Sequence, residues 1–452
     1  MTAIDPNIFR EYDIRGIVGT QLTTETVALV GRAMGTYFRQ HDAKRVALGF
    51  DARESSSEFC DILTRELTSS GCDVVRIGMV ATPVLYHTVY TQDIDGGVMI
   101  TGSHNPPDHN GFKICLGKHA LFGSEIREIG TLAEAGEFFY GSGTASDLDV
   151  KGPYLDDLAG RVSFGGRTIT AVVDAGNGMG GVTAVELYRR LGTDVTELYT
   201  DPDPTFPHHH PDPSLPENMT DLVAAVLKTK ADVGMAFDGD GDRLAVVDET
   251  GRIWWGDELL TLLARDVLRE HTGSIVIAEA KCSQTLFDDI ERHGGVPLMW
   301  KAGHSIIKAK MQETGAILGG EMSGHFFFAD RFYGFDDACY AGARVLEILS
   351  KTDQALSSLL NDLPLIFSTP EIRVPCPDEI KFDLVHRLAD DFSQDHEVNT
   401  IDGARITFDN GWGIVRPSNT QELLILRFEA DTEEHLNAIR REVETKVTQL
   451  LS

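Results

Sequence analysis

Continuous apolar runs and amphipathic segments alternate along the first 320 residues of the chain. The run Arg45–Asp51 is apolar between charged ends, which is typical of a strand buried on both faces of a sheet. A helical pattern follows, and Ser55 with Glu58 forms the spacing of a capping box. Further runs lie at Cys72–Gly78 and Gly97–Thr101. This order of strands and helices predicts a βαβαβ unit with a mainly parallel sheet.

The same order occurs twice more before the pattern changes. The predicted strands of these two further units are residues 169–174, 194–199, 231–237, 274–278, 295–300 and 315–319. Near the end of the chain, runs at 406–409, 411–415 and 423–428 are typical of an antiparallel sheet. A terminal helix follows, whose apolar face consists of Leu436, Ile439, Val443, Val447 and Leu450.

We therefore predict an α/β protein with four domains around a central cleft. The first three are related βαβαβ domains with mainly parallel mixed sheets, and the fourth is an α+β domain with an antiparallel sheet. The predicted boundaries are 1–150, 151–252, 253–368 and 369–452. A chain of 452 residues agrees with this division, because single cores stop growing at about 250–300 residues.

Charge and composition restrict the partners. The chain has 70 acidic and 40 basic residues, and a net charge of −30 argues against nucleic acid or an anionic membrane as the main partner. The first residues lack the pattern of a signal peptide, and no apolar run approaches the roughly 18 residues of a membrane span. Six scattered cysteines without CxxC spacing predict buried, reduced thiols and a cytoplasmic protein.

A polar loop follows the third strand of each predicted unit. The loop of the first unit contains Ser103 and His104, and that of the third contains Glu321, Ser323 and His325. Loops that follow the strands of open α/β sheets are where such folds place their chemistry. Because related units put equivalent loops at one topological position, we expect the three loops to face one cleft.

The loop of the second unit alternates aspartates with glycines. Glycine lets the backbone turn tightly enough for Asp238, Asp240 and Asp242 to converge on one hard cation such as Mg²⁺, Mn²⁺ or Ca²⁺. Without a cation, three carboxylates this close would repel one another. An EF-hand does not fit, because Arg243 stands where that loop needs glycine and residues 244–247 have a strand pattern.

Three other patterns have competing interpretations. Residues 174–181 contain GxGxxG after a strand, with Glu197 about 20 residues further on, which is the dinucleotide fingerprint of a nicotinamide-dependent oxidoreductase. We interpret it as a structural turn, since the equivalent loops of the other units are not glycine-rich. The consecutive histidines at 208–210 lie in a proline-rich loop and are interpreted as structural. Arg416–Thr420 offers a guanidinium, hydroxyls and an amide, which suit a phosphate group.

Six motifs, taken in order, resemble a known family. They are Glu11–Gly16, TGSHNP at 101–106, DGDGDR at 238–243, KAGHS at 301–305, GEMSGH at 320–325 and RPSNT at 416–420. Over nearly its whole length the chain resembles the α-D-phosphohexomutase superfamily, and specifically its bacterial phosphomannomutase/phosphoglucomutase members. The resemblance implies three related α/β domains and a C-terminal domain around one active-site cleft, which agrees with the repeat.

The resemblance also implies roles for individual residues. Ser103 would be the phosphoserine, with His104 and Lys113 next to it in proton transfer or charge stabilisation. The three loop aspartates would bind Mg²⁺, and the Ser103 phosphate would complete that site. The implied substrate-binding residues are Tyr12, Arg15, Arg243, Lys281, His304, Glu321, Ser323, His325, Arg416, Ser418, Asn419 and Thr420.

The implied reaction interconverts the 1-phosphate and 6-phosphate of a hexose, either mannose or glucose. The phosphoserine gives its phosphoryl group to the free hydroxyl, and the resulting hexose 1,6-bisphosphate turns around and returns its other phosphate to the serine. Hexose 1,6-bisphosphate is also the expected activator, and a monomer is expected. A phosphoglucosamine mutase is the alternative within the superfamily. One departure is visible, because Gln421 and Glu422 stand where family members commonly have a proline, and Glu422 adds a negative charge beside the phosphate loop.

Overall fold

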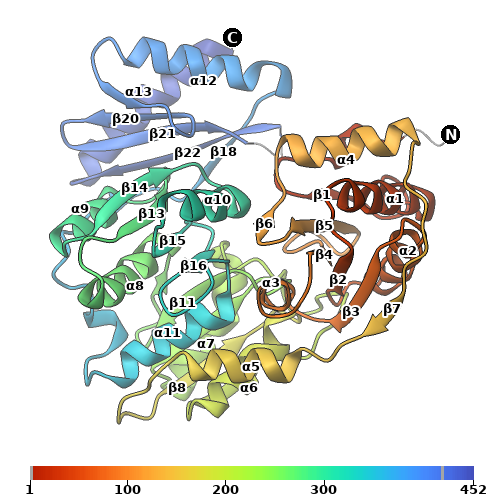
Figure 1. The fold of residues 1–452 in the computed structure, drawn as a ribbon. Helices are drawn as coiled ribbons and strands as arrows, with labels where there is room; N and C mark the ends of the chain where they lie inside the picture. Colours follow the sequence, from red (N-terminus) through yellow and green to blue (C-terminus); the bar gives the residue numbers. More distant parts are fainter. Residues whose placement is uncertain (1–3, 419–421, 452) are drawn as a thin grey trace.

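Four β-sheets define four domains in the computed structural model, which describes residues 4–418 and 422–451 (Figure 1). The first domain, red to orange, and the blue fourth domain lie at opposite sides of the upper part of the view, and the second domain lies at the bottom. Three domains have mixed sheets flanked by helices, and the fourth has an antiparallel sheet. The predicted fold class is confirmed.

The first domain is built on a sheet with the order β1-β5-β4-β2-β3-β7, and β6 pairs with β5. Its strands are β1 (Ile14–Ile17), β2 (Arg45–Phe50), β3 (Asp73–Met79), β4 (Gly96–Ile100), β5 (His109–Leu116), β6 (His119–Ala120) and β7 (Ala145–Asp147). Its helices are η1 (Pro6–Ile8), α1 (Thr24–Gln40), α2 (Ser56–Ser69), α3 (Thr82–Thr91) and α4 (Ser124–Ala135).

The second and third domains contain smaller sheets of five and four strands. The second consists of α5 (Lys151–Gly160), β8 (Thr170–Asp174), α6 (Gly180–Arg190), β9 (Asp194–Leu198), η2 (Pro216–Met219), α7 (Thr220–Thr229), β10 (Val233–Phe237), β11 (Leu244–Asp248) and β12 (Ile253–Trp254). The third consists of α8 (Gly256–Glu270), β13 (Ile275–Glu279), α9 (Gln284–Arg292), β14 (Val296–Trp300), α10 (His304–Thr314), β15 (Leu318–Gly320), β16 (Phe326–Phe328), α11 (Ala338–Ser350) and η3 (Leu356–Ser358).

One strand order is common to these three sheets. The order β3-β2-β4-β5 of the first recurs as β9-β8-β10-β11 in the second and as β14-β13-β15-β16 in the third. The strands β4, β10 and β15 occupy the same place in this order. Each is parallel to the strand before it in the order and antiparallel to the strand after it, which is also the next strand in the chain. The three predicted polar loops are therefore the connections of three equivalent antiparallel strand pairs.

The fourth domain has the sheet order β17-β22-β21-β20-β19, and β18 also pairs with β22. Its elements are β17 (Phe367–Ser368), β18 (Ile372–Pro375), α12 (Asp378–Phe392), β19 (Glu397–Asn399), β20 (Ala404–Phe408), β21 (Gly411–Pro417), β22 (Leu423–Ala430) and α13 (Glu433–Leu451). All pairings in it are antiparallel. The predicted apolar face of the last helix packs on this sheet, with Leu450 at its partly buried end.

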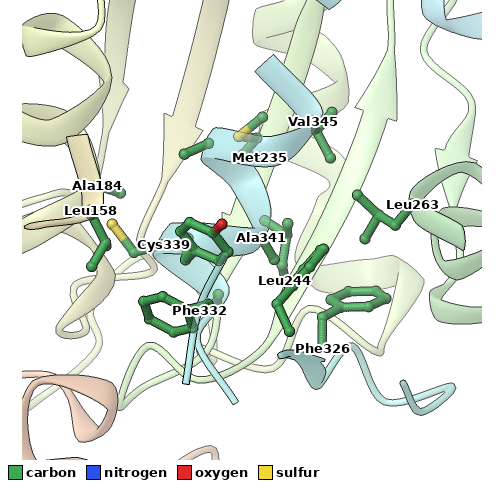
Figure 2. Packing of buried hydrophobic residues seen from close by; sticks show 14 of the residues in the cluster. Leu158, Ala184, Met235, Leu244, Leu263, Phe326, Phe332, Cys339, Ala341 and Val345 are labelled. Atoms are coloured by element: carbon green, nitrogen blue, oxygen red, sulfur yellow. The ribbon is translucent and has the colours of Figure 1, made fainter. Parts of the chain in front are cut away.

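The hydrophobic core is shared unequally among the domains. The largest cluster runs from α3 of the first domain through the second domain and into the third, and Figure 2 shows part of it, with Leu158, Met235, Leu263 and Phe326 around α11. The fourth domain has its own core. A small cluster of Ala280, Trp412 and Ile414 joins it to the third domain. Burial therefore couples the second and third domains strongly and the fourth more weakly.

Several sequence-based expectations can be compared with these elements. All six cysteines lie in the described part of the chain and are buried free thiols, as predicted. No helix within residues 4–418 and 422–451 is long and apolar enough to cross a bilayer. The predicted capping box at the start of α2 is wrong. The Ser55 hydroxyl makes no cap hydrogen bond and instead accepts one from the Asn110 side-chain amide at 2.8 Å, because β5 packs against this end of the helix.

Candidate active site

Ser103 lies in the loop that follows the fully buried strand β4, within contact of the second domain. Its φ of 49° is in the left-handed region, and its side chain is directed at the aspartate loop. Ser103 Oγ donates to Asp238 Oδ2 at 2.8 Å and lies 3.0 Å from His104 Nδ1. A Cβ on Gly239 would come within 2.2 Å of the Ser103 carbonyl oxygen, so only glycine permits this approach of the two loops.

The three aspartates of the second domain form one compact, fully buried group. Gly241, with a φ of 74°, provides the turn, and the backbone N–H groups of Asp242 and Arg243 donate to Asp238 Oδ1 at 3.0 and 3.1 Å. One carboxylate oxygen from each of the three aspartates lies within 4.8 Å of the other two. Among the described residues, nothing donates a hydrogen bond to the buried Oδ1 of Asp240. Buried carboxylate oxygens with an unused acceptor are a donor set that fits a hard divalent cation.

Two residues of the first domain also contact this group. Lys113 extends from β5 and is only 4% exposed; its ammonium donates to Asp240 Oδ2 at 2.7 Å and to Asp242 Oδ2. Thr82, the first residue of α3, donates its hydroxyl to the same Asp240 oxygen at 2.5 Å. The aspartate loop is thus held between two elements of the neighbouring domain.

Burial is the largest single influence on the ionisable groups of this centre. Burial, Asp242 and Asp240 raise the pKa of Asp238 well above its ordinary value, as happens when carboxylates share a site. Burial acts to lower the pKa of Lys113, but the aspartates outweigh it, so this pKa lies above its ordinary value and the ammonium stays charged. Burial and nearby arginines lower the pKa of His104 well below its ordinary value, so its imidazole is neutral at pH 7.

The loop of the third domain reaches the aspartates through His325. Its Nε2 lies 3.2 Å from Asp242 Oδ1, and its Nδ1 lies 2.9 Å from Glu321 Oε2 and 3.1 Å from Ser323 Oγ. Burial alone would lower the pKa of His325, but Asp242 and Glu321 raise it to about 9. The ring of His304 stands 5.7 Å from that of His325, centroid to centroid. The three equivalent loops therefore meet at one place, as the repeat predicts.

The remaining predicted residues lie at the contacts of the first, third and fourth domains. Arg15 donates to the Asn105 side chain of the Ser103 loop at 2.8 Å, and Tyr12 donates to the Ala302 carbonyl at 3.0 Å. The Ala302 N–H donates to Asp402 Oδ2, which also accepts from Arg416 Nε at 2.7 Å. Through Ala302 and Asp402, these hydrogen bonds connect Tyr12 of the first domain with Arg416 of the fourth domain.

The predicted phosphate loop is only partly described. Ser418 is buried, and its N–H donates to the Leu423 carbonyl at 2.9 Å. Asn419 and Thr420, with Gln421, lie outside the described residues. Glu422 is exposed. The ammonium of Lys281, from the third domain, pairs with Glu371 of the fourth domain and lies 3.4 Å from Glu279 Oε1.

Comparison with known proteins shows one family along the whole chain. The phosphoglucomutase/phosphomannomutase models match as alpha/beta/alpha domain I at residues 6–139, domain II at 152–251, domain III at 255–366 and the C-terminal domain at 371–446. The chain belongs to this family.

The alignments with individual relatives extend over almost the whole of this chain and of the relative. A Pseudomonas putida protein named phosphomannomutase/phosphoglucomutase is 44% identical over 97% of this chain and 95% of its own. A Neisseria gonorrhoeae phosphoglucomutase is 45% identical over 97% of this chain and 96% of its own. A Burkholderia thailandensis crystal structure, titled phosphoglucomutase/phosphomannomutase family protein, has a TM-score of 0.94 at 41% identity and covers 99% of this chain and 98% of its own.

In this phosphoglucomutase/phosphomannomutase family member, the glycine-rich turn after β8 supports the aspartate loop. The Met179 N–H donates to the Gly239 carbonyl at 3.0 Å, and a Cβ on Gly178 would come within 2.8 Å of that same oxygen. A hollow of about 690 Å³ adjoins the turn and includes Glu197, but the Glu197 carboxylate is held by Arg189 at 2.6 Å. The Gly239 backbone fills the space beside Gly178 that the pyrophosphate of a dinucleotide would need. The oxidoreductase interpretation is therefore wrong.

Three groups in this phosphoglucomutase/phosphomannomutase site lie outside the residues predicted from the sequence. Arg53 donates to the Ser103 carbonyl, and His210 contacts the His104 carbonyl. Asp336 accepts a hydrogen bond from the Lys308 ammonium at 2.7 Å, beside His304. The sequence pattern predicts a structural role for His210 but no partner. No short motif marks the other two, because their partners lie far away in the sequence or are backbone carbonyls.

Proposed function

We propose that this protein interconverts hexose 1-phosphate and hexose 6-phosphate, with glucose and mannose phosphates as substrates. The observation that carries the proposal is the position of Ser103 Oγ, 2.8 Å from Asp238 within a group of three buried carboxylates that belongs to another domain. A serine so placed can carry a phosphoryl group next to a divalent cation. Family membership supports the same reaction, because relatives over the full length carry the names phosphoglucomutase and phosphomannomutase.

Mg²⁺ fits this donor set, and Asp238, Asp240, Asp242 and the phosphate on Ser103 would hold it. When bound there, it neutralises charge on the transferring phosphoryl group. Oxygen-only ligands favour it over softer metals. Removal of divalent cations with EDTA should therefore abolish turnover.

The protein's own groups provide the rest of the charge. A phosphoserine carries about −1.5 to −2 charge at pH 7, and phosphoryl transfer depends mainly on positioning and electrostatic stabilisation. Lys113 is a fixed cation bound to two of the aspartates, which supports charge stabilisation and not proton transfer as its role. Arg243 lies 4.0 Å from Asp238 and adds a second cation beside Ser103.

In the transfer step, a bond forms between phosphorus and the sugar oxygen, and the bond to Ser103 Oγ breaks. Overall, one proton moves from the sugar hydroxyl to the serine oxygen, so the transfer needs no net proton from solvent. The neutral imidazole of His104, 3.0 Å from that oxygen, is placed to exchange a proton with it. The bisphosphate then turns around in the site. Its other phosphoryl group is transferred to Ser103, and the same protein groups act in the reverse direction.

We assign sugar recognition to the loop of the third domain and phosphate binding to the fourth. Glu321, Ser323 and His325 supply acceptors and donors for sugar hydroxyls, with His304 next to them. Lys281 and Arg416 supply charge for the substrate phosphate that does not react, and Tyr12 and Arg15 border the same space. A single phosphate position must accept either end of the sugar, because the intermediate reverses its orientation.

A coupled assay tests the proposal. Purified protein is given glucose 1-phosphate, mannose 1-phosphate or glucosamine 1-phosphate, with Mg²⁺ and trace glucose 1,6-bisphosphate as activator. We expect turnover of the first two and its loss in Ser103→Ala, while Ser393→Ala, an exposed serine that ends α12, keeps full activity. Full activity in Ser103→Ala would refute the phosphoserine. A preference for glucosamine 1-phosphate would favour the phosphoglucosamine mutase instead. The monomeric state and cytoplasmic location remain predictions.

A further inference from the structure

Arg53 lies beneath the phosphoserine loop and is 3% exposed. It follows β2 by three residues, and its guanidinium is positioned by Asp51, whose Oδ2 lies 3.3 Å from Arg53 Nε. The same Asp51 accepts hydrogen bonds from the Gly102 N–H at 3.2 Å and from the Ser56 hydroxyl at 2.6 Å. Asp51 and Arg53 therefore form a rigid base that touches the loop directly.

The guanidinium donates four hydrogen bonds to carbonyl oxygens of that loop and the strand after it. Nη2 donates to Ser103 O at 2.7 Å and to Asn105 O at 2.6 Å. Nη1 donates to Pro106 O at 2.6 Å and to His109 O at 2.9 Å. Both terminal nitrogens of the guanidinium donate only to backbone carbonyl oxygens. Arg53 therefore holds the backbone of the loop in its conformation.

Three contacts show how tightly this arrangement is packed. A Cβ on Gly102 would lie 2.6 Å from Arg53 Cζ, so the loop backbone rests directly on the guanidinium. The Ser103 carbonyl that Arg53 holds is also the atom that touches Gly239 of the aspartate loop. Phe206 of the second domain covers the guanidinium, with its ring centroid 5.4 Å from Cζ. Arg53 thus sets the contact between the phosphoserine loop and the metal-binding loop.

We propose that Arg53 is a positioning residue for phosphoryl transfer, which fixes the phosphorylated serine against the three aspartates through the carbonyl oxygens of residues 103, 105, 106 and 109. This inference rests on the proposed mutase function and adds a residue to its machinery. Arg53 acts through the backbone and does not touch the phosphoryl group. A lysine has three donors on one atom and lacks the planar fork, so it cannot hold four divergent carbonyls.

The test compares Arg53→Lys with Arg344→Lys. Arg344 is a matched control, because it is 1% exposed and lies in the third domain, where it pairs with Asp330 and Asp266. Each purified variant is measured for thermal unfolding, for kcat and KM with glucose 1-phosphate, and for single-turnover transfer from the phosphorylated enzyme. A misplacement of about 1 Å costs about 10²-fold in rate. We therefore expect kcat and the transfer rate of Arg53→Lys to fall about 100-fold, with KM nearly unchanged.

The control separates positioning from a general loss of stability. Arg344→Lys should lower the unfolding temperature at least as much, yet keep kcat within about twofold of the wild type. If Arg53→Lys keeps the wild-type transfer rate, or if both variants lose kcat equally, the inference is wrong. If the wild type itself shows no mutase turnover, the proposed function fails.

Gly102→Ala provides a second route to the same answer. Its new Cβ would displace the guanidinium without removing it, so the same fall in transfer rate with unchanged KM is expected, and a wild-type rate would contradict the inference. It decides the question if Arg53→Lys does not fold.

Discussion

Ser103 combines a strained backbone with a well-defined side chain. A left-handed φ costs a residue with a Cβ about 1 kcal/mol or more, and such strain persists only where neighbours enforce it. Here the neighbours are Arg53 on the carbonyl side, Gly239 against the carbonyl, and Asp238 on the hydroxyl. The conformation directs Oγ into the second domain, and it explains why glycines flank the contact.

Lys113→Met tests the fixed cation at this centre. The substitution keeps the buried apolar stem and removes the charge that lies between Asp240 and Asp242. Removing one electrostatic stabiliser of a transition state costs about 10²–10³ in kcat, and we expect a loss of that size. Because the ammonium competes with a metal for the same carboxylates, Mg²⁺ should bind more tightly to the variant in a calorimetric titration.

Lys446→Met, which removes a surface pair with Asp391 on the fourth domain, is the matched control and should leave both measurements unchanged. An unaltered kcat in Lys113→Met would show that the ammonium has no part in the reaction.

At the scale of single residues, the sequence predicts those site residues that lie together in a short motif after a strand. Ser103 and the aspartates are of this kind, because glycine and carboxylate spacing describes their chemistry directly. Arg53 is not, because its partners are carbonyl oxygens that every residue possesses. Asp336 and Lys308 also escape prediction, since a buried ion pair between α10 and the segment before α11 leaves no local pattern.

At the scale of elements, the start of α11 is a buried junction between two domains. Asp337 caps this helix by accepting from the Tyr340 N–H at 2.9 Å, and it also accepts from the Tyr154 hydroxyl of α5 at 2.9 Å. Burial raises the pKa of Asp337 to about 7. The cap hydrogen bonds act in the opposite direction, but burial outweighs them, so the folded state is favoured when this carboxyl group is protonated.

The pH dependence of stability follows from this shift. Asp337 has a folded-state pKa above its unfolded value of 3.8, so its contribution to stability is complete below about pH 4 and is lost as pH rises through about 7. Asp337→Asn keeps a neutral cap and should remove this dependence. We expect the variant to gain about 1–4 kcal/mol over the wild type between about pH 5 and about pH 8, measured by urea unfolding. Equal pH slopes for the two proteins would contradict this assignment.

The positions of helices and strands can be predicted well from the sequence, but the residues at which they begin and end are predicted less well. Strands such as β10, Val233–Phe237, are predictable because a strand buried on both faces must be apolar throughout. The cap of α2 is not, because the tertiary contact of Ser55 with Asn110 overrides the local pattern. The glycine-rich turn after β8 also misleads locally, since its glycines are required by the neighbouring loop and not by a ligand.

At the scale of the whole molecule, the fourth domain is attached by few apolar contacts and by buried arginines. Arg427 of β22 donates to Asp257 Oδ2 at 2.9 Å, to the Lys281 carbonyl and to Met322 Sδ at 3.0 Å. Arg405 donates to the carbonyls of Ala280 and Cys282. The acceptors lie in or beside the segments that carry Lys281 and the loop for which we propose sugar recognition, Gly320–His325.

Arg427→Leu tests this attachment. Breaking a buried ion pair leaves Asp257 without its charged partner, and such changes cost about 3–5 kcal/mol. We expect a lower unfolding temperature by calorimetry and a KM for glucose 1-phosphate raised about tenfold, with kcat less affected, because the phosphate loop belongs to the displaced domain. Arg440→Leu, which removes a surface pair on α13, should change neither quantity. An unchanged KM in Arg427→Leu would show that this arginine does not position the fourth domain for substrate.

The bond between Ser103 and Asp238 also constrains how the protein is made. Asp238 follows Ser103 by 135 residues, so the ribosome adds it much later, and Arg416 later still. A nascent chain that has completed its first domain presents the serine without the carboxylates that would hold a cation beside it. If Ser103 carries the phosphoryl group as proposed, the transfer needs both loops, so we expect a chain truncated before Asp238 to show no turnover of sugar phosphates.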